Sequence, residues 1–244
     1  MTAPTAPTAP PPESAALWED FLEIFIKPSA VFERRKSAGF IVPLLVLTVV
    51  IALLWFGLRD AMAPIIEADT ARTMAKAMAK NPQITEEVIA QQVAGANKMT
   101  PIFGTIAVPV IVLLVGLFTW LAGKMVGAAM SLGAAMMIAT YSYYPKVLGF
   151  LVTGAEVLLL PEDQVTGGAS VSVGPARLLD PDTASTLLVG TLVRLDLFTL
   201  WVTFLIAVGV RVVAKVPMSK ALVAAGIVWL IGHLPTLVGG LAAG

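Results

Sequence analysis

The chain has 244 residues, of which 57% are hydrophobic and only 13% are charged, and its mean hydropathy is +0.87. A soluble domain carries about 25% charged residues, so this composition excludes a fully water-exposed exterior and predicts an integral membrane protein. Sixteen Lys and Arg balance sixteen Asp and Glu, which argues against a nucleic-acid partner, and the lack of cysteine excludes disulfides, Fe–S clusters and zinc–thiolate centres.

Residues 1–13 form a tail of Pro, Ala and Thr that begins with three TAP repeats and ends in consecutive prolines. Such a segment cannot pack or pair, so we expect a solvated, extended chain. It is not a signal peptide, because it has neither a basic start nor an apolar centre.

The next segment, 14–38, is predicted to form two short helices, the first of them amphipathic. Its apolar residues fall at i, i+3, i+4 and i+7 and its acids lie off that line: Trp18, Phe21, Leu22 and Phe25 against Glu19, Asp20 and Glu23. Pro28 ends this helix, and the basic cluster 34–36 follows the second. We expect the pair to lie along the membrane surface. Packing on the cytoplasmic ends of the protein's own helices is the alternative.

Five apolar stretches are long enough to cross a bilayer, which requires roughly twenty apolar residues. They cover about 39–58, 101–123, 134–160, 186–213 and 221–243. The fourth contains Arg194 and Asp196, and its membrane part could begin near residue 186 or near residue 196. The predicted fold is therefore an all-α integral membrane protein, a bundle of five transmembrane helices in the domain 39–244.

Two hydrophilic connections separate these stretches. The insert 59–100 shows two segments of near-helical apolar spacing, broken at Asn81-Pro82, with acidic residues at the start of the second. We expect a helical hairpin outside the bilayer. Residues 161–182 are rich in Gly and Pro and predict a loop that could include a small hairpin at 166–173.

The distribution of basic residues predicts the orientation of the chain. Three basic residues precede the first span, and the turn 211–220 holds three more and no acid, whereas the loop 161–182 is net acidic. We expect a cytoplasmic N-terminus and, after five spans, an extracytoplasmic C-terminus, in the cytoplasmic membrane if the protein is bacterial.

Three segments resemble the Yip1 domain family, and its bacterial branch in particular. They are Phe25–Glu33 before the first span, Gly123 with Tyr141–Pro145 and the following Leu148-Gly149, and Leu195–Trp201 with the following Gly209. The resemblance implies a five-span protein with a cytoplasmic N-terminus. Eukaryotic members act in traffic between the endoplasmic reticulum and the Golgi and interact with Rab-type GTPases. That role is not carried over, because their N-terminal Asp-Leu-Tyr-Gly-Pro signature has no counterpart in residues 1–38.

Lys146 is the most informative charge, because it lies about twelve residues into the third span, near the bilayer middle. A lysine there costs roughly 2.5–3.5 kcal/mol on insertion scales, so it should face the bundle interior or a wet cavity. It could bind an ion, a proton or a lipid headgroup, or it could snorkel or form a structural ion pair. Pro145 predicts a kink, and Tyr141 and Tyr144 lie at the loosened turn as hydrogen-bond partners.

Two further residues complete the candidate polar site within the membrane. Asp196 can pair with Lys146 only if the fourth helix begins near 186; otherwise it lies at the outer interface. His233, the only histidine, lies midway along the fifth span, where it could titrate or bond to a neighbouring helix. A lone histidine also disfavours an all-protein transition-metal site.

The sequence contains no catalytic constellation and no cofactor motif. We expect a non-enzymatic protein that organises other membrane proteins or lipids, with the bilayer, other membrane proteins or a second copy as partners. A transport component that uses Lys146 is the alternative, and a membrane-embedded lipid enzyme is a third class. A dry, paired Lys146 favours the organiser, whereas a polar cavity open to one side favours transport.

Overall fold

A computed structural model describes residues 16–81 and 83–243, so the predicted tail 1–13 lies outside the described residues. The described chain is mostly helical and contains no strand, which confirms the all-α prediction. The helices in chain order are α1 Leu17–Ile26, α2 Pro28–Arg35, α3 Ile41–Gly57, α4 Arg59–Lys80, α5 Glu86–Met125, α6 Leu132–Ser142, α7 Pro145–Leu159, α8 Thr186–Val193, α9 Leu197–Ala214 and α10 Met218–Ala243. Two short 3₁₀ turns, η1 Glu162–Gln164 and η2 Pro175–Leu178, lie in the loop after α7.

Three of these helices are long and apolar enough to cross a membrane singly: α5, α9 and α10 as far as Gly239. A fourth candidate combines α3 with α4, which meet at a bend of 81°. The predicted third and fourth spans are each split in two. The third breaks between α6 and α7, where Pro145 lacks the N–H that would continue the helix, and the fourth breaks between α8 and α9.

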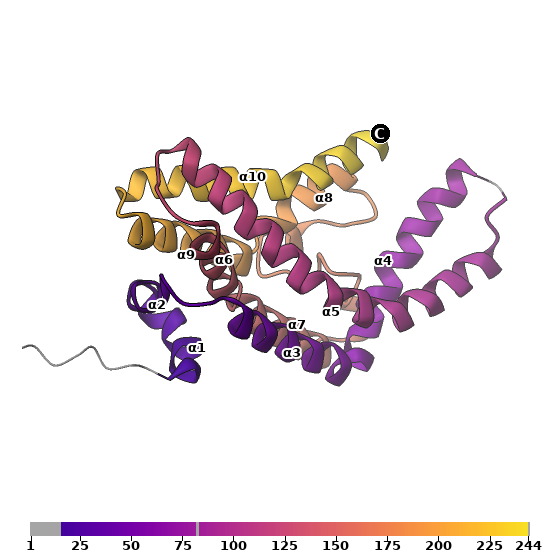
Figure 1. Ribbon diagram of the computed structural model, residues 1–244. Coiled ribbons are helices and arrows are strands. Elements are labelled where there is room, and N and C mark those ends of the chain that lie inside the picture. Colours follow the sequence, from indigo (N-terminus) through magenta and orange to yellow (C-terminus); the bar gives the residue numbers. More distant parts are fainter. Residues whose placement is uncertain (1–15, 82, 244) are drawn as a thin grey trace, which may run out of the picture.

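The insert 59–100 consists of two helices, α4 and the first turns of α5, and the second helix is continuous with the second apolar stretch. α5 has 40 residues and is ~60 Å long at 1.5 Å per residue, about twice the thickness of a bilayer core. Its first turns and α4 form an arm that projects from the bundle (Figure 1). Within the arm, Asn97 Nδ2 donates to Glu67 Oε1 at 2.7 Å.

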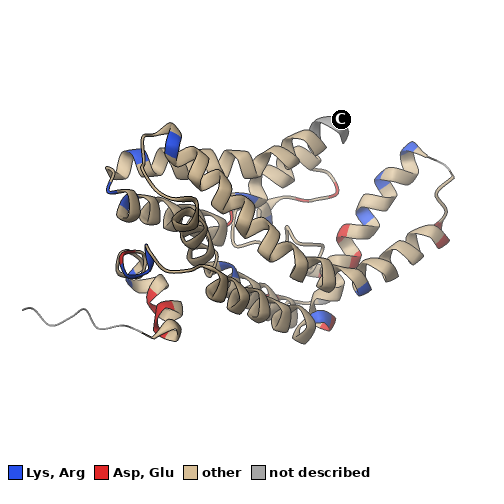
Figure 2. Cartoon of the chain, in the orientation of Figure 1, with Lys and Arg blue, Asp and Glu red and all other residues tan. Residues whose placement is uncertain are grey.

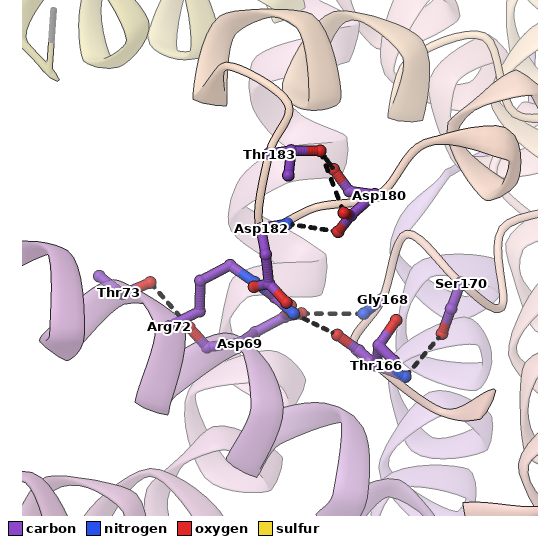
Figure 3. A network of polar contacts seen from close by, with 9 residues as sticks. All are labelled: Asp69, Arg72, Thr73, Thr166, Gly168, Ser170, Asp180, Asp182 and Thr183. Atoms are coloured by element: carbon purple, nitrogen blue, oxygen red, sulfur yellow. Dashed lines mark hydrogen bonds and ion pairs between the residues drawn. The ribbon is translucent and has the colours of Figure 1, made fainter. Parts of the chain in front are cut away.

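The loop between α7 and α8 folds back onto the arm instead of forming the predicted hairpin at 166–173. Arg72 of α4 donates to Asp182 Oδ1 at 2.7 Å and to the Thr166 carbonyl at 2.6 Å (Figure 3). Asp69 accepts from the Gly168 amide at 3.0 Å. Gly167 has a φ of +129°, which favours glycine, and a Cβ there would lie 2.2 Å from the Asp69 carboxylate. We call these contacts the Arg72 clamp. They hold the loop through the backbone of Thr166 and Gly168 and through the Asp182 side chain.

The core of the bundle is built around α6, which is almost completely enclosed. Met137, Ile138 and Tyr141 of this helix have no exposed surface, and they pack in one cluster with Leu205 of α9 and Val112 of α5. A central helix surrounded by apolar neighbours explains why its sequence is apolar on every side.

The predicted apolar face of α1 is divided between two environments. Trp18, Leu22 and Ile26 are 63%, 62% and 73% exposed, whereas Phe21 stacks on Tyr144 at 4.9 Å between ring centroids. Asp20, which the sequence places on the polar face, is fully buried. The helix pair therefore packs against the bundle by a face that includes a charge, and it leaves an apolar line outside.

The two ends of the bundle carry different elements. α1, α2, the turn after α5 and the turn between α9 and α10 lie at one end (Figure 1). The arm, α8 and the end of α10 lie towards the other.

Candidate functional site

Lys146 lies in the first turn of α7, directly after the break that follows α6. Its Nζ donates to Thr199 Oγ1 of α9 at 2.6 Å and lies 4.0 Å from Asp196 Oδ1. Its side chain is 33% exposed and that of Asp196 is 16% exposed. The lysine is thus bound by a hydroxyl, with a carboxylate as a more distant second partner.

Asp196 is the N-cap of α9, and both of its oxygens accept backbone hydrogen bonds. Oδ1 accepts from the Phe198 amide and Oδ2 from the Val173 amide, each at 3.0 Å. The Leu197 amide in turn donates to the Val173 carbonyl at 3.0 Å. Asp196 therefore fixes the start of α9 to the loop between α7 and α8, independently of its contact with Lys146.

The two helix breaks lie next to each other, which brings Lys146 and Asp196 together. α7 and α9 approach closely at Gly149, where a Cβ would lie 2.9 Å from the Phe198 ring. A larger side chain at this position would separate the helices. The glycine thus allows the first turns of two interrupted helices to meet, and that contact creates the polar site.

The hydroxyls of Tyr141 and Tyr144 have partners in the N-terminal elements and not at Lys146. Tyr144 donates to the Pro43 carbonyl of α3 at 2.8 Å. Tyr141 lies 3.5 Å from Asp20 Oδ2, and both rings are buried. The two hydroxyls therefore connect the break to the N-terminal elements, while Pro145 begins α7.

His233 belongs to a separate cluster between α8 and α10. Its Nε2 lies 3.3 Å from Thr191 Oγ1 and its ring stacks on Trp229, while its Nδ1 is buried without a hydrogen-bond partner. Arg194 donates to the Trp229 carbonyl at 3.2 Å, and the Trp229 indole donates back to the Arg194 carbonyl at 3.3 Å. The six predicted site residues therefore fall into three groups. Lys146 and Asp196 are in contact, Tyr141 and Tyr144 with Pro145 at the break face α1 and α3, and His233 is apart from both.

A buried ion-pair network, which the sequence analysis did not predict, surrounds Asp20. Arg34 Nη2 and Arg35 Nε each approach an Asp20 oxygen at 2.5 Å, and Arg34 also pairs with Glu23 at 2.5 Å. The hydrogen bonds that Arg34 donates to the Asp20 and Glu23 carboxylates raise the pKa of Arg34 above its ordinary value. The signal in the sequence was the occurrence of acids in α1 and adjacent arginines in α2, two helices joined by one residue.

In the described ranges, no group of three His, Asp or Glu side chains could hold a metal ion. Two cavities of the described chain, with volumes of about 330 and 460 Å³, are lined by residues other than Lys146 and Asp196.

The comparison with known families decides the identity of the domain. The family model of the Yip1 domain matches residues 22–239, nearly the whole chain. The chain belongs to the Yip1 domain family. No curated protein and no solved structure matches it significantly.

Membership of the Yip1 family and the apolar helices together make this an integral, multi-pass membrane protein. The Yip1 match begins at Leu22 within α1 and includes all of α2. The Asp20 network therefore joins the first residues of the Yip1 domain to the residues just before it. The arm also lies inside the matched region, so it is part of the Yip1 domain of this chain.

Proposed function

We propose that this Yip1 domain protein is a non-enzymatic organiser of membrane proteins or lipids. The observation that carries the proposal is the environment of Lys146, which binds Thr199 at 2.6 Å within the bundle. A transport route would require a wet, polar cavity at this depth. Two cavities of the described chain lie elsewhere, beside the corner between α3 and α4 and at the start of α10.

Two surfaces are suited to contacts with partners. The arm extends ~22 Å beyond the apolar part of α5, since residues 86–100 rise 1.5 Å each. Near its tip, Met78 and Val88 are both 37% exposed. At the opposite end, α1 presents the exposed line of Trp18, Leu22 and Ile26, which can enter the interfacial layer of a membrane.

We further propose five membrane passes with a cytoplasmic N-terminus. The passes would be α3, α5, the interrupted pair α6–α7, α9 and α10. Non-helical backbone at membrane depth is tolerated where it is buried in protein, and the break at Tyr143 and Tyr144 lies among α1, α3 and α9. The separation of α1 and α2 from the end of α10, which lie towards opposite ends of the bundle, supports an odd number of passes (Figure 1).

The test compares partners of the full chain, captured with photo-crosslinkers at the exposed arm positions Ala79 or Gln91, by mass spectrometry of protein and lipid together. The organiser role predicts a specific partner that is lost when Met78 and Val88 are replaced by lysine. The matched control Lys76→Gln, on the same arm, should retain it. Solute flux through proteoliposomes that disappears in Lys146→Met would instead establish transport and overturn the proposal.

A further inference from the structure

A shallow, open groove lies where α5 ends and α10 begins. It has a volume of about 460 Å³ and is lined by Met125, Val126, Ser219, Lys220 and Val223. The Lys220 ammonium lies over the turn after α5, 4.0 Å from where a Cβ would stand on Gly127. The groove therefore has one cationic group and one hydroxyl at its rim.

The surroundings of this groove carry positive charge without acidic partners on the same helices. Lys124, Arg211, Lys215 and Lys220 lie near the ends of α5, α9 and α10, whereas the sequence contains no Asp or Glu in 99–155 or in 197–244. Figure 2 shows blue and no red on these three helix ends. Glu33 of α2 interacts with Lys215 but is itself bonded to Lys36. The groove is thus left with a net positive potential.

The walls of the groove are apolar and face outward. Met125 is 74% exposed and Val223 is 55% exposed, and both lie on membrane-crossing helices. Trp120, one turn before the end of α5, lies beneath Lys124 at 3.6 Å from ring centroid to Nζ. An indole with a cation above it is typical of the membrane interface. The groove therefore lies where headgroups meet acyl chains.

We propose that this groove binds an anionic phospholipid, with its phosphate at Lys220 and Ser219 and an acyl chain along Met125 and Val223. The charge complementarity favours an anionic lipid over a zwitterionic one, because basic pockets between membrane helices recognise anionic headgroups. The proposal rests on the proposed function in one respect, since it names a lipid class that the organiser would bind.

Native mass spectrometry of the purified full chain in mild detergent tests the assignment, with dioleoyl phosphatidylglycerol and dioleoyl phosphatidylcholine as probes. We expect retention of the first lipid and not of the second. Lys220→Gln should weaken the apparent affinity for phosphatidylglycerol about fivefold, since one cation near an anionic headgroup contributes about that factor. The matched control Arg211→Gln removes the same charge at the same end but does not line the groove, and it should bind as the wild type does.

Three results would overturn the proposal. Equal retention of the two lipids would remove the charge selectivity. An equal loss in Lys220→Gln and Arg211→Gln would show diffuse attraction rather than a site. Full competition by inorganic phosphate at the same concentration would show a simple ion site. Each of these leaves the crosslinked partner at the arm unaffected, so failure here is distinguishable from failure of the organiser role.

Discussion

At the scale of single residues, the polar interior of the bundle depends on groups that bond to backbone and hydroxyl more than on ion pairs. Lys146 lies 2.6 Å from Thr199 Oγ1 but 4.0 Å from Asp196 Oδ1. Asp196 keeps two backbone donors whether or not the lysine is present. The two residues should therefore contribute nearly independently to stability.

Lys146→Met should change the free energy of unfolding by less than about 1 kcal/mol, because the desolvation cost of the charge is removed with the charge. Asp196→Ala should cost about 2–3 kcal/mol, because it removes the N-cap of α9 and leaves the Val173 amide without its acceptor. A double-mutant cycle on unfolding in detergent measures the coupling, expected below about 1 kcal/mol. A coupling of about 3–5 kcal/mol would instead identify a buried ion pair.

Asp20→Asn should destabilise the N-terminal helix pair by about 2–3 kcal/mol. The change removes the negative charge and replaces one of the two acceptor oxygens with an NH2 donor, beside two arginines whose side chains are only 24% and 21% exposed. Glu23→Gln is the matched comparison and should cost less than about 1 kcal/mol, because its side chain is 27% exposed and Arg34 keeps Asp20. Limited proteolysis between α2 and α3, with thermal unfolding, checks both values. Equal effects of the two substitutions would contradict the burial of Asp20.

At the scale of the elements, residues at each helix interruption form hydrogen bonds with other parts of the fold, and we call these interruptions joints. The break after α6 is tied to α3 by Tyr144 and approaches α1 through Tyr141. At the break before α9, Asp196 accepts a hydrogen bond from the loop between α7 and α8. An interruption frees backbone groups, so each joint requires neighbours that provide hydrogen bonds.

The two tyrosines form a matched pair for testing the joint after α6. Tyr144→Phe should cost about 1 kcal/mol, because it removes a buried 2.8 Å hydrogen bond to the Pro43 carbonyl. Tyr141→Phe should cost less, since its hydroxyl is 3.5 Å from Asp20, at the limit of a hydrogen bond. Thermal unfolding in detergent ranks the two. The reverse order would mean that the joint is held from α1 rather than from α3.

The Arg72 clamp should stabilise the loop between α7 and α8 without affecting the stability of the bundle. Arg72→Ala removes the bonds to Asp182 and the Thr166 carbonyl, so the amides of 166–170 should exchange with deuterium faster while the unfolding temperature changes little. Lys76→Ala, one turn further along α4, is the control and should leave the exchange unchanged. If the loop stayed protected in Arg72→Ala, the bond from the Gly168 amide to Asp69 alone would hold it.

At the scale of the whole molecule, charge and shape divide the bundle into two different ends. α1 and α2 lie at one end, together with the basic turns after α5 and α9. The arm and the loop between α7 and α8 lie towards the other end (Figures 1 and 2). A bundle with a basic end is expected to keep that end in the cytoplasm.

The natural chain has no cysteine, so single cysteines can test this topology without background labelling. Lys76→Cys on the arm should react with a membrane-impermeant thiol reagent added outside intact cells. Lys220→Cys should react only after the membrane is opened. Labelling of both from the same side would contradict the proposed topology and require a different number of passes.

The sequence by itself determined the class of this protein, its Yip1 domain and the approximate positions of its apolar helices. These properties depend on composition and local periodicity, because a bilayer requires long apolar segments whose backbone bonds are satisfied within the helix. Pro145 likewise marked its interruption locally. Only the tertiary structure decided which polar groups meet, since Lys146 and Thr199 are 53 residues apart and Tyr141 and Asp20 are 121 apart. The spacing in α1 places Asp20 off the apolar line, and it cannot show the burial of Asp20 because its partners lie on another helix. Burial of a charge depends on what packs against it, and no local pattern carries that information.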